Sequence, residues 1–148
     1  MSSEKYGVVM DEDEIADFLE AQGIGTLSMG NETGGYGIPM SFGYDRAGDR
    51  CLLNLSFGGD DTKSEYLKEG NQVTLSTYEW HDVDEWRSVV VRGTLEEVSI
   101  AENPHVAGIF AAYSKLASRD VFQQPLEELD FEWYELQIED VHGRQAVE

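Results

Sequence analysis

The feature that most constrains the fold is a series of strand-like segments that follow one another closely along the chain. In residues 36–45, large apolar residues alternate with small or polar ones, which is the period of a half-buried β-strand. A turn sequence at 46–49 joins this segment to another at 50–57, so the two are expected to pair as a hairpin. Further strand patterns lie at 25–30, 72–80, 86–99 and 131–140. Strands joined mostly by hairpins indicate an antiparallel barrel with helices packed outside it.

Two segments have the period of amphipathic helices. In residues 10–22 the apolar face consists of Ile15, Phe18 and Leu19, and Asp11 with Glu14 fits a capping box. Asn103 and Pro104 are expected to cap a second helix, with Pro104 at its first position. Its apolar stripe is Val106, Ile109, Phe110, Tyr113 and Ala117. A shorter helix is predicted at 62–69, and the whole chain is expected to form one mainly β domain, residues 1–148.

Two residues interrupt the strand patterns. Pro39 lacks a backbone N–H, so its segment is expected to lie at a sheet edge or to contain a bulge. Gly93 stands within a long run of strand-forming residues and is expected to mark a bend or bulge.

The charge of the chain is strongly negative: 30 acidic residues stand against 10 basic ones, for a formal net charge of −20. The acidic residues are spread along the chain between ordinary apolar patterns, so a disordered acidic tail does not explain them. Such a surface resembles that of proteins from salt-accumulating archaea, where concentrated cations screen self-repulsion. The same charge argues against nucleic acid and anionic membranes as partners.

Cysteine content and hydropathy bear on location. Cys51 is the single cysteine, so no internal disulfide is possible, which fits a reducing cytoplasm. No apolar run approaches the length needed to span a membrane, and nothing resembles a signal peptide. The expected location is therefore the cytoplasm.

An anion-binding pattern interrupts this acidic sequence at residues 53–64. An apolar strand pattern leads into Gly58 and Gly59, and Thr62-Lys63-Ser64 then opens a helical pattern. Glycines let the backbone approach an anion, and a helix start offers unpaired N–H groups at the positive end of its dipole. The segment predicts a phosphate cradle in which Lys63 supplies the full positive charge.

Three segments, taken together, resemble the flavin-binding split β-barrels of the pyridoxamine 5′-phosphate oxidase-like superfamily. The first joins residues 25–28 to 39–45, the second is 53–73, and the third is 86–96. Their order and spacing match over roughly residues 11–100. The resemblance implies a six-stranded antiparallel split β-barrel of the FMN-binding type, mainly β with flanking helices.

The resemblance also implies a cofactor, FMN, bound in a groove between the two subunits of a homodimer. Lys63 with Thr62 or Ser64 would hold its phosphate. The other residues that the family pattern places along the cofactor are Met40, Ser41 and Phe42 at the isoalloxazine, Asn54 and Ser56 at the ribityl chain, and Trp86 and Ser88 reaching across the dimer.

The residues alone leave a plainer interpretation open for several of these positions. Lys63 could be a solvated surface lysine. Met40 and Phe42 share a strand face and could be core residues. Trp86 could cover the end of the barrel, and Ser88 could face solvent.

The leading function is an FMN-dependent oxidoreductase that acts on an unidentified small molecule. The chain lacks an arginine-rich C-terminal signature and has no histidine between Leu53 and Gly59, two features that specify reactions in relatives. A non-catalytic module that stores or senses flavin, and a reductase dependent on the deazaflavin F420, remain alternatives. No residue favours haem, and His81, His105 and His142 share no metal-ligand spacing.

Overall fold

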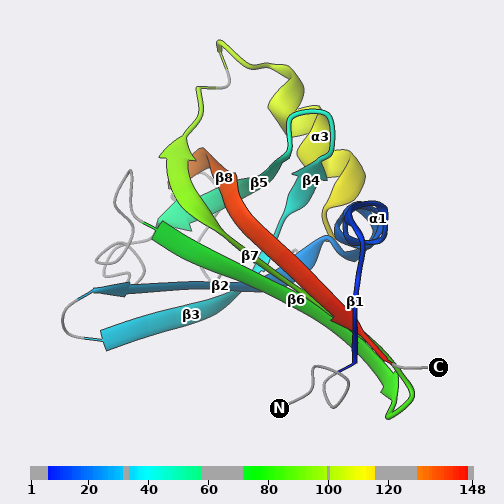
Figure 1. The fold of residues 1–148 in the computed structure, drawn as a ribbon. Coiled ribbons are helices and arrows are strands. Elements are labelled where there is room, and N and C mark those ends of the chain that lie inside the picture. Colours follow the sequence, from blue (N-terminus) through cyan, green and yellow to red (C-terminus); the bar gives the residue numbers. More distant parts are fainter. Residues whose placement is uncertain (1–6, 32–33, 58–71, 100, 116–129, 147–148) are drawn as a thin grey trace.

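A computed structural model of the chain describes residues 7–31, 34–57, 72–99, 101–115 and 130–146. The described strands form one antiparallel sheet in the order β3-β2-β6-β7-β8-β5-β4, and β1 pairs with β8. The strands are β1 (Val8–Val9), β2 (Ile24–Asn31), β3 (Gly34–Ser41), β4 (Gly43–Asp45), β5 (Arg50–Phe57), β6 (Gln72–Asp82), β7 (Glu85–Glu97) and β8 (Asp130–Gln145). The helices are α1 (Glu12–Gln22) and α3 (His105–Tyr113), which lie together beside β4 at one end of the barrel (Figure 1).

The predicted fold class is confirmed: the chain is a mainly antiparallel β protein with two described helices, matching a split β-barrel. Six strands correspond to the six predicted segments, and the short strands β1 and β4 bring the sheet to eight. Pro39 lies in β3, which stands at one end of the strand order, as expected for a strand interior without an N–H. The helix predicted at 62–69 lies outside the described residues.

The barrel closes where the predicted strand 36–45 breaks. β3 ends at Ser41 and β4 begins at Gly43, yet β3 and β4 lie at opposite ends of the strand order. At Phe42 the chain therefore passes from one edge of the sheet to the other. The Phe42 side chain is fully buried in the core, and its backbone N–H donates to the Gly23 carbonyl oxygen at 3.0 Å.

Alternating residues of the long strands fill the core between the sheet and α1. β6 contributes Val73, Leu75 and Thr77, and β7 contributes Val89, Val91 and Leu95. From α1, Ile15, Phe18 and Leu19 are buried as predicted. The helix begins with the predicted capping box, in which the Asp11 side chain accepts from the Glu14 N–H and the Glu14 side chain accepts from the Asp11 N–H.

α3 packs on a smaller apolar cluster formed by Leu52, Val98 and Val106, with Ile109 and Trp133 against it. Phe110 of the helix meets Trp133 of β8 edge to face, with ring centroids 5.3 Å apart. The helix begins at His105, one residue later than predicted, because Pro104 stands at the N-cap position. Of the predicted stripe, Tyr113 is 41% exposed, and Ala117 lies outside the described residues.

A bulge lies where Gly93 predicted one. The pairing of β7 with β8 runs Arg92 to Asp140 and then Gly93 to Ile138, so Glu139 is the extra residue of β8. A Cβ on Gly93 would lie 1.9 Å from the carbonyl oxygen of Gln137, so only glycine fits this close approach. Consequently Glu139 and Asp140, two adjacent residues, are both exposed on the outer surface of the sheet.

Candidate functional site

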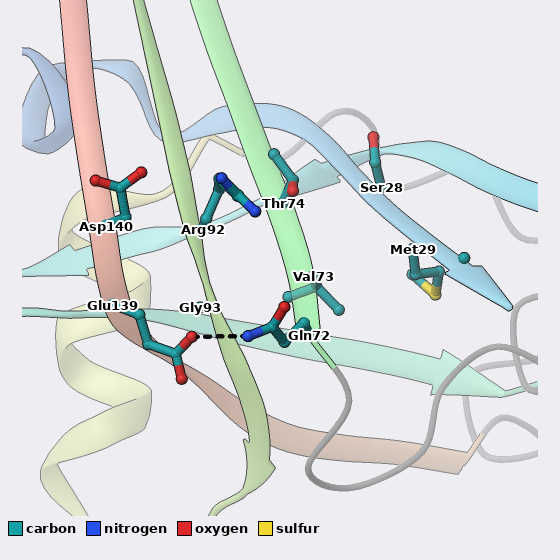
Figure 2. Close-up of a pocket in the computed structure, with 10 residues that line it drawn as sticks. Ser28, Met29, Gln72, Val73, Thr74, Arg92, Gly93, Glu139 and Asp140 are labelled. Atoms are coloured by element: carbon teal, nitrogen blue, oxygen red, sulfur yellow. Dashed lines mark hydrogen bonds between the residues drawn. The ribbon is translucent and has the colours of Figure 1, made fainter.

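A groove of about 590 Å³ crosses the outer surface of four adjacent strands, β2, β6, β7 and β8 (Figure 2). Its walls are mostly polar or glycine. The lining residues are Ser28, Met29, Gly30, Gln72, Val73, Thr74, Arg92, Gly93, Glu139 and Asp140. One of its lining residues, Gln72, is the first residue that the structure describes after segment 58–71. That segment contains the predicted phosphate cradle.

The bulge places two carboxylates in this groove and fixes one of them. The Glu139 carboxylate accepts from the Gln72 side-chain amide at 3.1 Å and from the Thr94 hydroxyl at 2.7 Å. These two donors hold it across β7, with its contact to Gln72 at the start of β6 drawn in Figure 2. Asp140 lies beside His142, with 3.7 Å between a carboxylate oxygen and the imidazole Nδ1.

Arg92 is the cationic residue of the groove. It is exposed, and its guanidinium makes no ion pair or hydrogen bond with any described residue. Its strand neighbours are Thr74 on β6 and Asp140 on β8, and the side chain extends toward Thr74 (Figure 2). The guanidinium donors are therefore directed at the hydroxyl-lined half of the groove.

Other described arginines form ion pairs with carboxylates, as expected in so acidic a chain. Arg46 contacts three carboxylates of α1, at 3.4 Å from Asp13, 2.8 Å from Asp17 and 3.2 Å from Glu20. Arg50 lies between Asp45 and Glu135 beneath α3, where its side chain is 17% exposed. These pairs hold structural elements together, and Arg92 differs from them because it contacts no carboxylate among the described residues.

Three predicted cofactor residues meet at the barrel closure. Met40 is partly buried against the core, and the Ser41 hydroxyl donates to the Lys115 carbonyl oxygen at 2.5 Å. Because the Phe42 side chain is fully buried, only its backbone is available to a ligand. The Phe42 side chain is therefore a core residue, which was the alternative interpretation of this position.

Asn54 offers a different observation. It lies in β5 opposite Trp133 of β8, and its side-chain oxygen Oδ1 is buried without a hydrogen-bond partner. A buried acceptor that stays unpaired destabilises a fold by about 1–3 kcal/mol, so native structures rarely keep one without a reason. This atom therefore marks a place where a ligand donor would be accommodated.

Trp86 and Ser88 lie on the outer surface of β7, away from Asn54. Trp86 pairs with Trp80 across the β6–β7 hairpin, and Ser88 pairs with Tyr78. Tyr78 and Trp80 are 71% and 63% exposed, so an aromatic surface continues along this hairpin. Three strand steps of about 4.8 Å separate Ser88 from Ser41 in the order β3-β2-β6-β7. Within one chain, Ser88 is therefore not adjacent to the residues at the barrel closure.

The structure does not describe the side chains of the remaining predicted site residues. Thr62, Lys63 and Ser64 are outside the described residues. Ser56 belongs to β5, opposite Phe131, and only its backbone is described. Arg92, which was not among the predicted site residues, lines the groove and has no ion pair with any described residue.

Other reactive groups in the described part of the chain have structural explanations. Burial raises the pKa of the Cys51 thiol to about 12, which agrees with a small buried core residue. Within the described ranges, no cluster of three or more histidine, cysteine or carboxylate side chains is placed to hold a metal ion. None of the helices described is long and apolar enough to cross a membrane.

Comparison with solved structures finds the same fold over nearly the whole chain. An FAD-binding protein from Mesorhizobium loti matches with a TM-score of 0.69 and 21% identity, covering 95% of this chain and 97% of its own. An FAD-binding protein from Mycobacterium smegmatis matches with a TM-score of 0.68 and 18% identity, covering 94% and 98%. An FAD- and haem-binding protein from Mycobacterium smegmatis matches with a TM-score of 0.65 and 15% identity, covering 93% and 72%.

Comparison with curated proteins finds no significant match. The family model described as pyridoxamine 5′-phosphate oxidase, however, matches residues 11–145, which include the barrel, both described helices and the groove. The chain therefore belongs to the pyridoxamine 5′-phosphate oxidase-like family.

Proposed function

We propose that this protein binds the FMN portion of a flavin and acts as a flavin-dependent oxidoreductase on a small molecule. The observation that carries the proposal is the unpaired, buried Oδ1 of Asn54, on the strand that the family pattern places along the ribityl chain. A ribityl chain carries hydroxyl groups, and one of them would donate to this oxygen. The flavin-binding names of the matched structures and the family assignment support the same ligand class.

The described residues fit the role of positioning a cofactor. A bound flavin supplies the redox chemistry, so the protein needs to orient it and shield it from water. Ser41 is already anchored to Lys115, and Met40 is held against the core, which would keep this wall of the site rigid. Lys63, with Thr62 or Ser64, is the proposed phosphate ligand. Turnover with a reduced pyridine nucleotide distinguishes an oxidoreductase from a flavin store or sensor.

We also propose that the protein is a homodimer in the cytoplasm, with each flavin held by both subunits. Trp86 and Ser88 lie on the outer surface of β7, three strands away from β3 and the barrel closure. If they contact the flavin, they would therefore contact the one that the other subunit holds at its barrel closure. The exposed side chains of Tyr78 and Trp80, with the half-buried Trp86 opposite Trp80, form the face that a second copy would cover.

The role of Asn54 is tested by Asn54→Leu, which replaces an unpaired polar group with an apolar one of similar size. In flavin-free protein the unfolding free energy should rise by about 1 kcal/mol, because no buried acceptor is left unsatisfied. FMN affinity, measured by fluorescence quenching, should fall about tenfold because the hydrogen bond is lost. Asn54→Asp is the control and should lower both quantities, since it buries an unpaired charge. A Leu variant with unchanged FMN affinity would contradict the proposed contact.

The phosphate site is tested by Lys63→Ala. FMN binding should weaken by on the order of 1.5–3 kcal/mol, the range for a hydrogen bond to a charged group. Lys115→Ala is the matched control, because the described contacts of Lys115 run through its backbone N–H and carbonyl. The absorbance spectrum of the purified protein identifies the chromophore before titration. Equal FMN affinity of the two folded variants would remove Lys63 from the site.

The shared site is tested by mixing Lys63→Ala subunits with Trp86→Ala subunits. If each flavin contacts Lys63 of one chain and Trp86 of the other, a mixed dimer has one site with both defects and one with neither. Fully competent FMN sites should then reappear, up to half of the sites in each mixed dimer. If both residues serve one chain's own site, no competent site returns.

The final element of the proposal is that folding depends on salt. A net charge of −20 repels itself, and at ~1 M salt the Debye length of roughly 3 Å removes most of that repulsion. Circular dichroism and sedimentation should show loss of the folded dimer as KCl is lowered from several molar. Stability that is constant or greater at low salt would exclude a salt-adapted protein.

A further inference from the structure

We infer that a second cleft, between the start of α1, β8 and the turn after β4, binds a small organic cation in which an ammonium group is attached to an apolar body. The cleft has a volume of about 660 Å³, which is within the range of small-molecule sites. None of the described residues that were predicted to contact the flavin lines it. The inference therefore concerns a site beyond the proposed flavin site and does not depend on it.

The bulge in β8 explains why there is space here. Glu139 and Asp140 both lie on the outer surface of the sheet. The inward-facing residues on either side of them, Ile138 and Val141, are therefore three positions apart instead of two. The inner row of β8 thus lacks one side chain at this level, beside the first turn of α1.

The floor of the cleft is apolar and continuous with the core. Ile138 and Val141 pack against the main core cluster but are only partly buried. At the rim, Val9 of β1 is 65% exposed. Covering apolar surface of this kind is favourable by roughly 25 cal/mol per Å². The floor consists of Ile15, Ala16, Leu19, Tyr44, Ile138 and Val141.

The walls of the cleft are held in place by contacts within the chain. The Met10 N–H donates to the Gly143 carbonyl oxygen at 3.0 Å, which ties the start of α1 to β8. Arg46, from the turn after β4, contacts Asp13 of α1 at 3.4 Å. Because these contacts form the cleft before a ligand enters, binding requires little ordering of the protein.

The rim of the cleft is negative. The carboxylates of Asp11, Glu12 and Asp49 line it, and none of them forms an ion pair with a described residue. Arg46 also lines the cleft, but its guanidinium is already bound by three carboxylates of α1. An ammonium group at this rim would form charge-assisted hydrogen bonds, whereas an anion would be repelled.

Tyr44 connects the apolar floor to the negative rim. Its hydroxyl donates to the Asp49 carboxylate at 3.1 Å. Burial, and then this hydrogen bond, raise the pKa of Tyr44 above its ordinary value, so the phenol stays neutral and continues to donate. The Asp49 carboxylate is thereby held at the edge of the floor, where it would meet a charged group attached to an apolar body.

The test compares the binding of four probes to wild-type protein by isothermal titration calorimetry. Phenethylammonium carries both an ammonium group and an apolar body. 2-Phenylethanol has the same body without charge, phenylacetate has the phenyl ring with a negative charge, and ethylammonium has the positive charge without the ring. The KCl concentration is fixed at a value that keeps the protein folded, because salt screens the contact between ammonium and carboxylate.

Two double variants then remove the same amount of charge in different places. Glu12→Gln with Asp49→Asn, the cleft variant, removes two carboxylates of the rim. Asparagine tolerates the φ of 51° at position 49 and still offers Tyr44 an acceptor. Glu102→Gln with Asp84→Asn, the surface variant, makes the same change at exposed residues outside the cleft.

Phenethylammonium should bind wild-type protein about tenfold more tightly than each of the other probes, because it alone uses both the rim and the floor. The cleft variant should lose about tenfold in affinity for phenethylammonium and keep its affinity for 2-phenylethanol within about twofold. The surface variant should keep both affinities within about twofold. Saturating FMN should leave phenethylammonium binding unchanged, since the two sites are separate.

The probe series on wild-type protein overturns the inference if phenethylammonium does not bind, or if any other probe binds equally well. An equal loss in the two double variants also overturns it, because the amine would then be attracted only by the net charge of −20. Competition with FMN would place the amine in the flavin site and has the same consequence. None of these results decides whether flavin binds, so the proposed function is tested separately.

Discussion

The fold depends on one carbonyl group, that of Gly23. It accepts from the N–H of Phe42 at 3.0 Å and from the N–H of Lys115 at 2.9 Å. One acceptor thus joins the end of α1, the passage between β3 and β4, and the chain that leaves α3. Gly23 has a φ of 67°, and a Cβ there would lie 2.6 Å from the carbonyl oxygen of Tyr113, so a side chain is excluded both by conformation and by space.

This junction gives structural roles to three neighbouring residues that the sequence analysis predicted to lie along the cofactor. Phe42 must be buried for the chain to cross from one sheet edge to the other, so its side chain is committed to the core. Ser41, one residue earlier, is tied to Lys115, and Met40 is held against the core. The residues that were predicted to lie along the flavin are therefore fixed by the same contacts that close the barrel, which would give a ligand bound there a rigid wall.

The elements that sequence predicted well are those determined by local chemistry. The capping box of Asp11 and Glu14, the hairpin at 46–49 and the bulge at Gly93 each depend on residues close in sequence. The break at Phe42 was not predicted, because alternation continues through it and only the pairing of β3 and β4 at opposite edges reveals it. The same limit applies to Arg92, since its freedom from ion pairs follows from the direction of a side chain, which sequence does not fix.

The strongly negative charge of the chain determines the surroundings of its arginines, including Arg92 in the groove. In an acidic protein most cations are neutralised by neighbours, as Arg46 is by three carboxylates of α1. Arg92 has no such partner among the described residues, and one of the two carboxylates of its groove, that of Glu139, accepts from Gln72 and Thr94 instead. The bulge at Gly93 thus adds a carboxylate to the outer surface of β8 near Arg92, so an irregularity in strand pairing decides which charges line the groove.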